Sequence, residues 1–125
     1  MSKKKRKSTE KPKISAMLLD IAGKYIDMGE SSEEKENYLR CATSAWNIAC
    51  LPLSKREVAI REYLAQYQAF NNADETDCAA VEENIRLLIK QKDEMYPHAK
   101  IVIVDSKINR VNGEDQVVVA SLRMG

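Results

Sequence analysis

The fold of this chain is decided by one stretch of sequence, SSEEKENYLRCATSAWNIACLP, residues 31–52. Ser31 and Glu34 form a capping box, in which the serine hydroxyl accepts a backbone N–H of the first turn and the glutamate reaches back. Beyond the box the helix is apolar most of the way round, which is typical of a helix at the centre of its domain. Pro52 ends it, because the residue before a proline is pushed out of the α region. We therefore expect a central helix with Trp46 in the core.

Helical patterns flank this central helix on both sides. The preceding helix begins at Ile14 and stops at Gly29, where glycine supplies the left-handed conformation that commonly ends a helix. The following helix opens with a second capping box, Ser54 to Glu57, and Asp74 is the expected N-cap of the last helix. Short connections place sequential helices antiparallel, which predicts an up-down bundle. The expected apolar faces of these three helices are Ile14, Met17, Leu18, Ile21, Tyr25 and Met28; Ile60, Tyr63, Leu64 and Tyr67, with Phe70 at the end; and Cys78, Val81, Ile85, Leu88, Ile89 and Met95.

The last part of the chain changes from a helical to a strand pattern. Residues 101–104 and 117–120 are β-branched runs, and Asn112-Gly113 between them is a strong hairpin signal. Simple two-residue pairing around this turn gives poor alternation, so the register stays open. Neither strand has a polar face, which predicts cover on both sides of the ribbon. The fold class expected is mainly α (α+β): a four-helix up-down bundle over about 14–96 with a C-terminal β-hairpin over about 100–123.

Charge divides the chain near residue 13. The first thirteen residues hold seven basic side chains and one acidic one, a net charge of +6, whereas residues 14–125 hold 13 basic and 18 acidic residues, a net charge of −5. We expect residues 1–13 to be a disordered basic arm, because clustered like charges repel and no apolar anchor precedes residue 14. Residues 14–125 have the length of a single globular domain.

Composition indicates a cytoplasmic protein without a membrane span. No apolar run reaches the roughly 18–20 residues that a span needs. The three cysteines, Cys41, Cys50 and Cys78, are odd in number and widely spaced. This favours reduced, buried thiols over a disulfide framework.

The sequence contains few residues that could form a catalytic or metal-binding site. His98, the only histidine, could pair with a cysteine as a nucleophile or complete a Cys3His zinc site with all three cysteines. The cysteines lie on apolar helical faces and are far apart, so a solvated histidine at a helix-to-strand corner is the simpler interpretation. Acidic clusters fall in or near first helical turns, where the positive end of the helix dipole stabilises negative charge. We expect no enzyme, no cofactor and no metal.

The segment Ala45–Pro52, AWNIACLP, followed by Lys55-Arg56, resembles a helix-and-turn stretch of uncharacterised bacterial proteins that elsewhere carry the cysteine-rich SEC-C zinc motif. The resemblance covers about a third of the chain. It implies a helical accessory domain of bacterial type. The zinc motif itself, with its close cysteine pairs, is absent from this chain, so the resemblance implies no metal site.

Two segments are candidates for contacts with partners. Five contiguous cations, Lys3, Lys4, Lys5, Arg6 and Lys7, are a pattern that neutralises phosphates without sequence preference. They predict an accessory nucleic-acid-binding protein. The alternative is a tail that only increases solubility and has no dedicated partner.

The second candidate is the run Val117, Val118 and Val119, which has high β propensity and no charge. On an open edge such a run pairs with other strands. We expect a homodimer contact there, with a ribbon folded against its own bundle as the alternative. The leading functional hypothesis is a non-enzymatic intracellular interaction or accessory protein.

Overall fold

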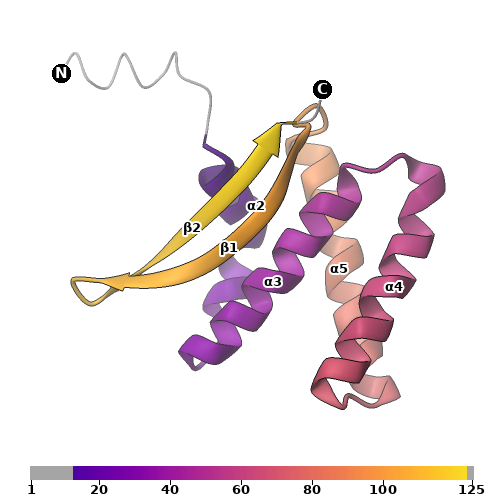
Figure 1. Ribbon diagram of the computed structural model, residues 1–125, viewed down its shortest axis with the longest axis horizontal. Helices are drawn as coiled ribbons and strands as arrows, with labels where there is room; N and C mark the ends of the chain where they lie inside the picture. The colour runs from indigo at the N-terminus through magenta and orange to yellow at the C-terminus, as the bar shows by residue number, and fades with distance from the viewer. Residues whose placement is uncertain (1–12, 124–125) are drawn as a thin grey trace.

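The computed structural model describes residues 13–123, and within them four helices are followed by an antiparallel hairpin (Figure 1). The predicted fold class, a mainly α (α+β) four-helix bundle with a C-terminal hairpin, is confirmed. The prediction of a disordered arm falls almost entirely on residues 1–12, outside the described part. The elements are α2 (Ile14–Asp27), α3 (Ser32–Ala49), α4 (Leu53–Asn71), α5 (Glu75–Met95), β1 (Ile101–Val111) and β2 (Glu114–Arg123).

Helix α3 is central, as its sequence predicts. It packs against the other three helices and against β1, and Trp46 has 0% exposed surface. The Ser31 hydroxyl accepts the Glu34 backbone N–H at 3.1 Å, so the serine cap is confirmed. The Glu34 carboxylate accepts the N–H of Glu30 at 2.7 Å, one residue before the position expected of a capping box.

The prediction of a left-handed Gly29 is wrong, since Gly113 is the one glycine of residues 13–123 with a positive φ. Close packing is the reason for Gly29 instead. A Cβ built on it would lie 2.8 Å from the backbone nitrogen of Lys35. The chain therefore folds tightly back onto the first turn of α3, and no side chain fits between the two segments.

Two further predictions about α4 are wrong. The helix begins at Leu53 after Pro52, with no side-chain cap, so Ser54 lies inside the first turn and forms no capping box. Phe70 is 88% exposed instead of lying on the buried face. In α4 only Ile60 is fully buried, so this helix is held to the bundle over a narrow stripe. Helix α5 begins with the predicted N-cap: the Asp74 side chain accepts the backbone N–H of Asp77 at 2.8 Å.

The hairpin has the two-residue turn that Asn112-Gly113 predicts. Both residues have positive φ, 53° and 80°, and Val111 pairs with Glu114. A register shift between residues 103 and 105 places Val104 outside the pairing. This bulge exchanges the two faces of β1, which is why simple alternation fails to give the register.

The ribbon packs on the bundle with one face only, so the expectation of cover on both sides is wrong. Its inner face includes the buried Ile103 and the half-buried Ile108, Val117 and Val119, all against the helical core. The outer face is left open, with Val118 41% exposed and Leu122 65% exposed. In Figure 1 the ribbon crosses the bundle, with β1 along α3 and β2 over α2.

Candidate functional site

The first part of the outer edge of β1, at Ile101 and Ile103, is closed by side chains from α3. The Asn47 amide donates to the Ile103 carbonyl at 2.8 Å and accepts the Ile103 N–H at 2.8 Å. Trp46 Nε1 donates to the Ile101 carbonyl at 2.7 Å. Asn47 thus makes the same pair of hydrogen bonds that an additional strand would make. This part of the edge is therefore not available for pairing with another chain.

The outer edge of β2 has no such cover. In an antiparallel pair the backbone groups of alternate residues point away from the partner strand. From the pairing of Val111 with Glu114, the outward groups of β2 belong to Asp115, Val117 and Val119. Within residues 13–123 no side chain or loop donates to these carbonyls or accepts from these N–H groups. We call this row of backbone groups the β2 edge.

The predicted interface residues lie on two different faces of the ribbon. Val117 and Val119 point into the bundle, whereas Val118 points outward. Their side chains therefore do not form one contact surface, and what they share is the β2 edge of their backbone. The sequence predicts the segment as an interface, but the register that separates the three valines depends on the bulge at Val104.

The stretch that carries the SEC-C resemblance connects the helices to one another and to β1. Besides Trp46 and Asn47, the Cys50 thiol lies 3.6 Å from the Ile101 carbonyl. Arg56 donates to the Ala49 carbonyl at 2.6 Å and forms an ion pair of 2.7 Å with Asp93. It thereby satisfies a free carbonyl at the end of α3 and ties α3 to α4 and α5. These residues hold the ribbon and helices in place and leave no polar group aimed at a ligand.

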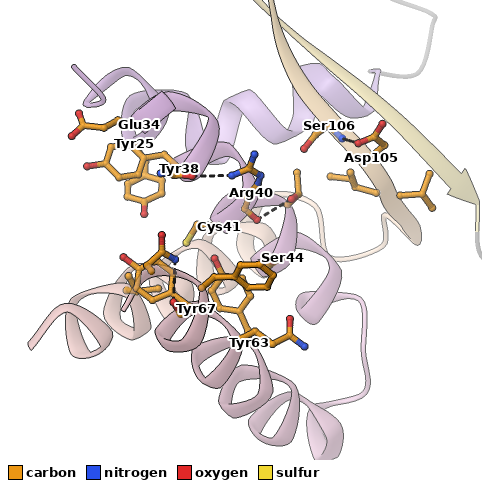
Figure 2. Close-up of a pocket in the computed structure, with 18 residues that line it drawn as sticks. Tyr25, Glu34, Tyr38, Arg40, Cys41, Ser44, Tyr63, Tyr67, Asp105 and Ser106 are labelled. Carbon is orange, nitrogen blue, oxygen red and sulfur yellow. Dashed lines mark hydrogen bonds between the residues drawn. The ribbon is translucent and has the colours of Figure 1, made fainter. Parts of the chain in front are cut away.

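A tyrosine-lined groove of about 890 Å³ opens between α3 and α4. Figure 2 shows Tyr25 and Tyr38 on one side of Cys41 and Tyr63 and Tyr67 on the other. The rings of Tyr25 and Tyr38 are stacked with centroids 4.6 Å apart. We call this feature the tyrosine groove. Its walls come from segments that are far apart in sequence, and the expected helix faces marked these tyrosines only as core residues.

The thiols and phenols at the groove floor are unsuited to nucleophilic chemistry. Burial raises the pKa of Cys41, and the hydroxyls of Tyr25 and Tyr63 oppose this shift only in part. Cys50 lies outside the groove lining, and burial raises its pKa as well, with a smaller opposing effect from Lys92. The same cause, with a contribution from Cys41, raises the pKa of Tyr25 and Tyr63. These groups stay protonated at neutral pH, whereas a reactive cysteine needs a lowered pKa.

The remaining sequence candidates are not brought together. All three cysteines are free, with Cys41 buried and Cys50 and Cys78 half-buried. His98 is exposed at the corner before β1. Nowhere in residues 13–123 do three or more His, Cys, Asp or Glu side chains come close enough to hold a metal ion, so the alternative Cys3His site is not formed.

Lys3, Lys4, Lys5, Arg6 and Lys7, the predicted nucleic-acid contacts, lie outside the described residues. In the part of the chain that is described, no helix is both long and apolar enough to cross a bilayer.

Comparison with known proteins identifies no relative. The chain matches no protein-family model, no curated protein and no solved structure. The resemblance to SEC-C proteins therefore stays a prediction.

Proposed function

We propose that this chain is a non-enzymatic, cytoplasmic interaction protein that assembles into a homodimer through the β2 edge. A single observation carries the proposal: the two edges of the ribbon differ in how their backbone groups are covered. The β1 edge is closed by Trp46 and Asn47 at Ile101 and Ile103, before the bulge, while no part of the β2 edge has a partner within residues 13–123.

An open edge of this kind is a template for pairing. Natural proteins protect long edges with prolines, charges, bulges or a covering element. The ten residues of β2 contain no proline, and the central run Val117–Ala120 has no charged side chain. The one bulge lies on β1. The edge thus has the composition of a strand that is paired in the working assembly.

Symmetric self-pairing fits the sequence of β2. In an antiparallel arrangement centred on Val118, the outward groups of Val117 face those of Val119 in the second copy. Val118 then lies opposite its own copy on the symmetry axis, and two-fold symmetry is the commonest solution for a self-association of this kind.

The experiment compares Val119→Pro with Val119→Ala in the full-length chain. Both substitutions remove the half-buried valine side chain, but only proline also removes the outward N–H. The N–H of this residue points away from β1, so the ladder between the two strands is kept. Sedimentation velocity at about 1–100 µM measures the mass, and far-UV circular dichroism confirms folding of each variant.

We expect the wild type and Val119→Ala to sediment as dimers and Val119→Pro to sediment as a folded monomer. Val118→Lys should also give a monomer, because two lysines would meet on the symmetry axis. A wild-type monomer at the highest concentration, or a Val119→Pro dimer of unchanged stability, would overturn the proposal.

A second candidate function is nucleic-acid binding through the basic arm, which the net charge of +6 in residues 1–13 favours. Contacts by five cations should give weak, sequence-independent binding whose logarithm falls with log[salt] at a slope of about −4. Replacing Lys3, Lys4, Lys5, Arg6 and Lys7 by glutamine should remove it. Binding that survives this replacement would place the contact on the acidic body instead and contradict the hypothesis.

A further inference from the structure

The tyrosine groove opens at an acidic pole of the molecule. The connection α2–α3 and the connection α4–α5 lie at the same end of the bundle, the lower end in Figure 1. Residues 27–37 and 70–83, which include these connections, contain ten acidic side chains and one basic one, Lys35. Lys35 is already paired with Asp115 at 3.1 Å. Both segments contribute residues to the groove wall, and Glu34 is the one of their ten acids that lines it directly.

The groove walls combine aromatic rings with carboxylates. Tyr38 and Tyr67 are half-exposed, and Phe70 at the end of α4 is 88% exposed. Figure 2 shows Glu34 at one end of the groove and Asp105 at the other.

The groove contains one cation among its lining residues, the exposed Arg40. It donates to the side chain of Asn37 at 2.9 Å. Its single charge is outnumbered by the two carboxylates of the lining and by the acidic pole around the mouth.

We infer that the tyrosine groove binds a lysine- and arginine-rich extended segment of a partner protein. Cations are attracted to the faces of aromatic rings. The aliphatic stems of lysine and arginine lie along apolar surface while their charged ends reach water or a carboxylate. A groove with rings along its walls and acids around its mouth offers both contacts to successive residues of such a segment. This inference concerns a site separate from the β2 edge.

Charge complementarity selects this occupant over the alternatives. Nucleic acid and acidic peptides would meet the ten carboxylates of the pole, and the cost of bringing like charges together opposes them. A purely apolar helix would remove the charges of Glu34 and Asp105 from water as it covered them, without an opposite charge to offset that cost. The chain's own residues 1–13 share the cationic chemistry, and the experiment separates them from a partner segment.

The test measures binding of dye-labelled octalysine and octa-arginine to the full-length chain by fluorescence anisotropy, with octaglutamate as the negative probe. Tyr67→Leu keeps an apolar side chain but removes the aromatic face, and should weaken binding about two- to five-fold. Glu34→Gln keeps the acceptor for the Glu30 N–H and removes one charge, and should weaken binding about two-fold. Glu94→Gln, an exposed acid on the C-terminal turn of α5, is the matched control and should change nothing.

Equal weakening by Glu34→Gln and Glu94→Gln, or full affinity in Tyr67→Leu, would overturn the inference, because binding would then follow net charge alone. A second variant replaces Lys3, Lys4, Lys5, Arg6 and Lys7 by glutamine. Unchanged peptide affinity in this variant supports a groove that is open to a partner. Affinity raised more than about three-fold would show that the chain's own basic segment occupies the groove, and would overturn a partner segment as the occupant. None of these substitutions touches β2, so the dimer measurement stays independent.

Discussion

Replacing Asn47 by alanine should detach β1 from α3 at a measurable cost in stability. The substitution removes both hydrogen bonds to the backbone of Ile103, a residue that is only 5% exposed. A buried backbone group left without a partner costs about 1–3 kcal/mol. Two such groups give about 2–6 kcal/mol, and the better helix propensity of alanine returns about 0.6 kcal/mol. Partial access of water favours the lower end, so we expect a loss of about 2–3 kcal/mol.

The assay is urea unfolding followed by far-UV circular dichroism, with Asn84→Ala as the matched control. Asn84 also lies inside a helix, α5, and its side chain makes no hydrogen bond within residues 13–123. Its replacement should leave the free energy of unfolding unchanged or slightly raised. Hydrogen exchange should also accelerate at the Ile103 amide in Asn47→Ala. If the two variants differ by less than about 0.5 kcal/mol, Asn47 does not hold the ribbon, and the argument for a closed β1 edge fails.

Three further predictions follow from the core, the turn and the buried phenols. Trp46→Ala should cost about 3–5 kcal/mol in denaturant melts, because the ring is fully buried and its Nε1 donates to Ile101; a loss below about 1 kcal/mol would contradict a core role. Gly113→Ala should cost about 1 kcal/mol, because φ is +80° there with open space around the Cβ position. An unchanged melting temperature would argue against that turn. Since burial raises the pKa of Tyr25 and Tyr63 above 10.0, their contribution to stability is complete below about pH 10 and is lost as pH rises above it. Ultraviolet titration should show these two phenols ionising only together with loss of the helical circular dichroism signal. Ionisation while that signal is intact would refute the burial of the two phenols.

Local signals were enough to predict the four helices and the hairpin turn, although the predictions of a left-handed Gly29 and of a capping box at Ser54 were wrong. The Ser31 cap, the Asp74 cap and the Asn112-Gly113 turn all lie within a few residues of the groups they organise. Apolar periodicity likewise depends only on residues three or four apart. The central position of α3 and the burial of Trp46 could therefore be predicted, because a helix that is apolar all round has few other places in a domain.

Long-range contacts decided what the sequence left open. Lys92 was not expected in the core, yet it is 2% exposed, donates to the Ala99 carbonyl at 2.9 Å and lies 5.2 Å from the centre of the Trp46 ring. A buried lysine needs such partners, and no periodicity shows where they will be.

The candidate surfaces depend on the tertiary structure for the same reason. The sequence predicts that β2 can pair, but only the packing of Asn47 against Ile103 shows that the start of the β1 edge is closed whereas the β2 edge is open. The tyrosine groove is formed by residues from α2, α3, α4, α5 and β1. Sequence by itself determined the elements, because caps, turns and periodicity act between near neighbours. Tertiary structure decided which backbone groups and aromatic rings stay exposed for a partner, because this depends on which distant segments pack over them.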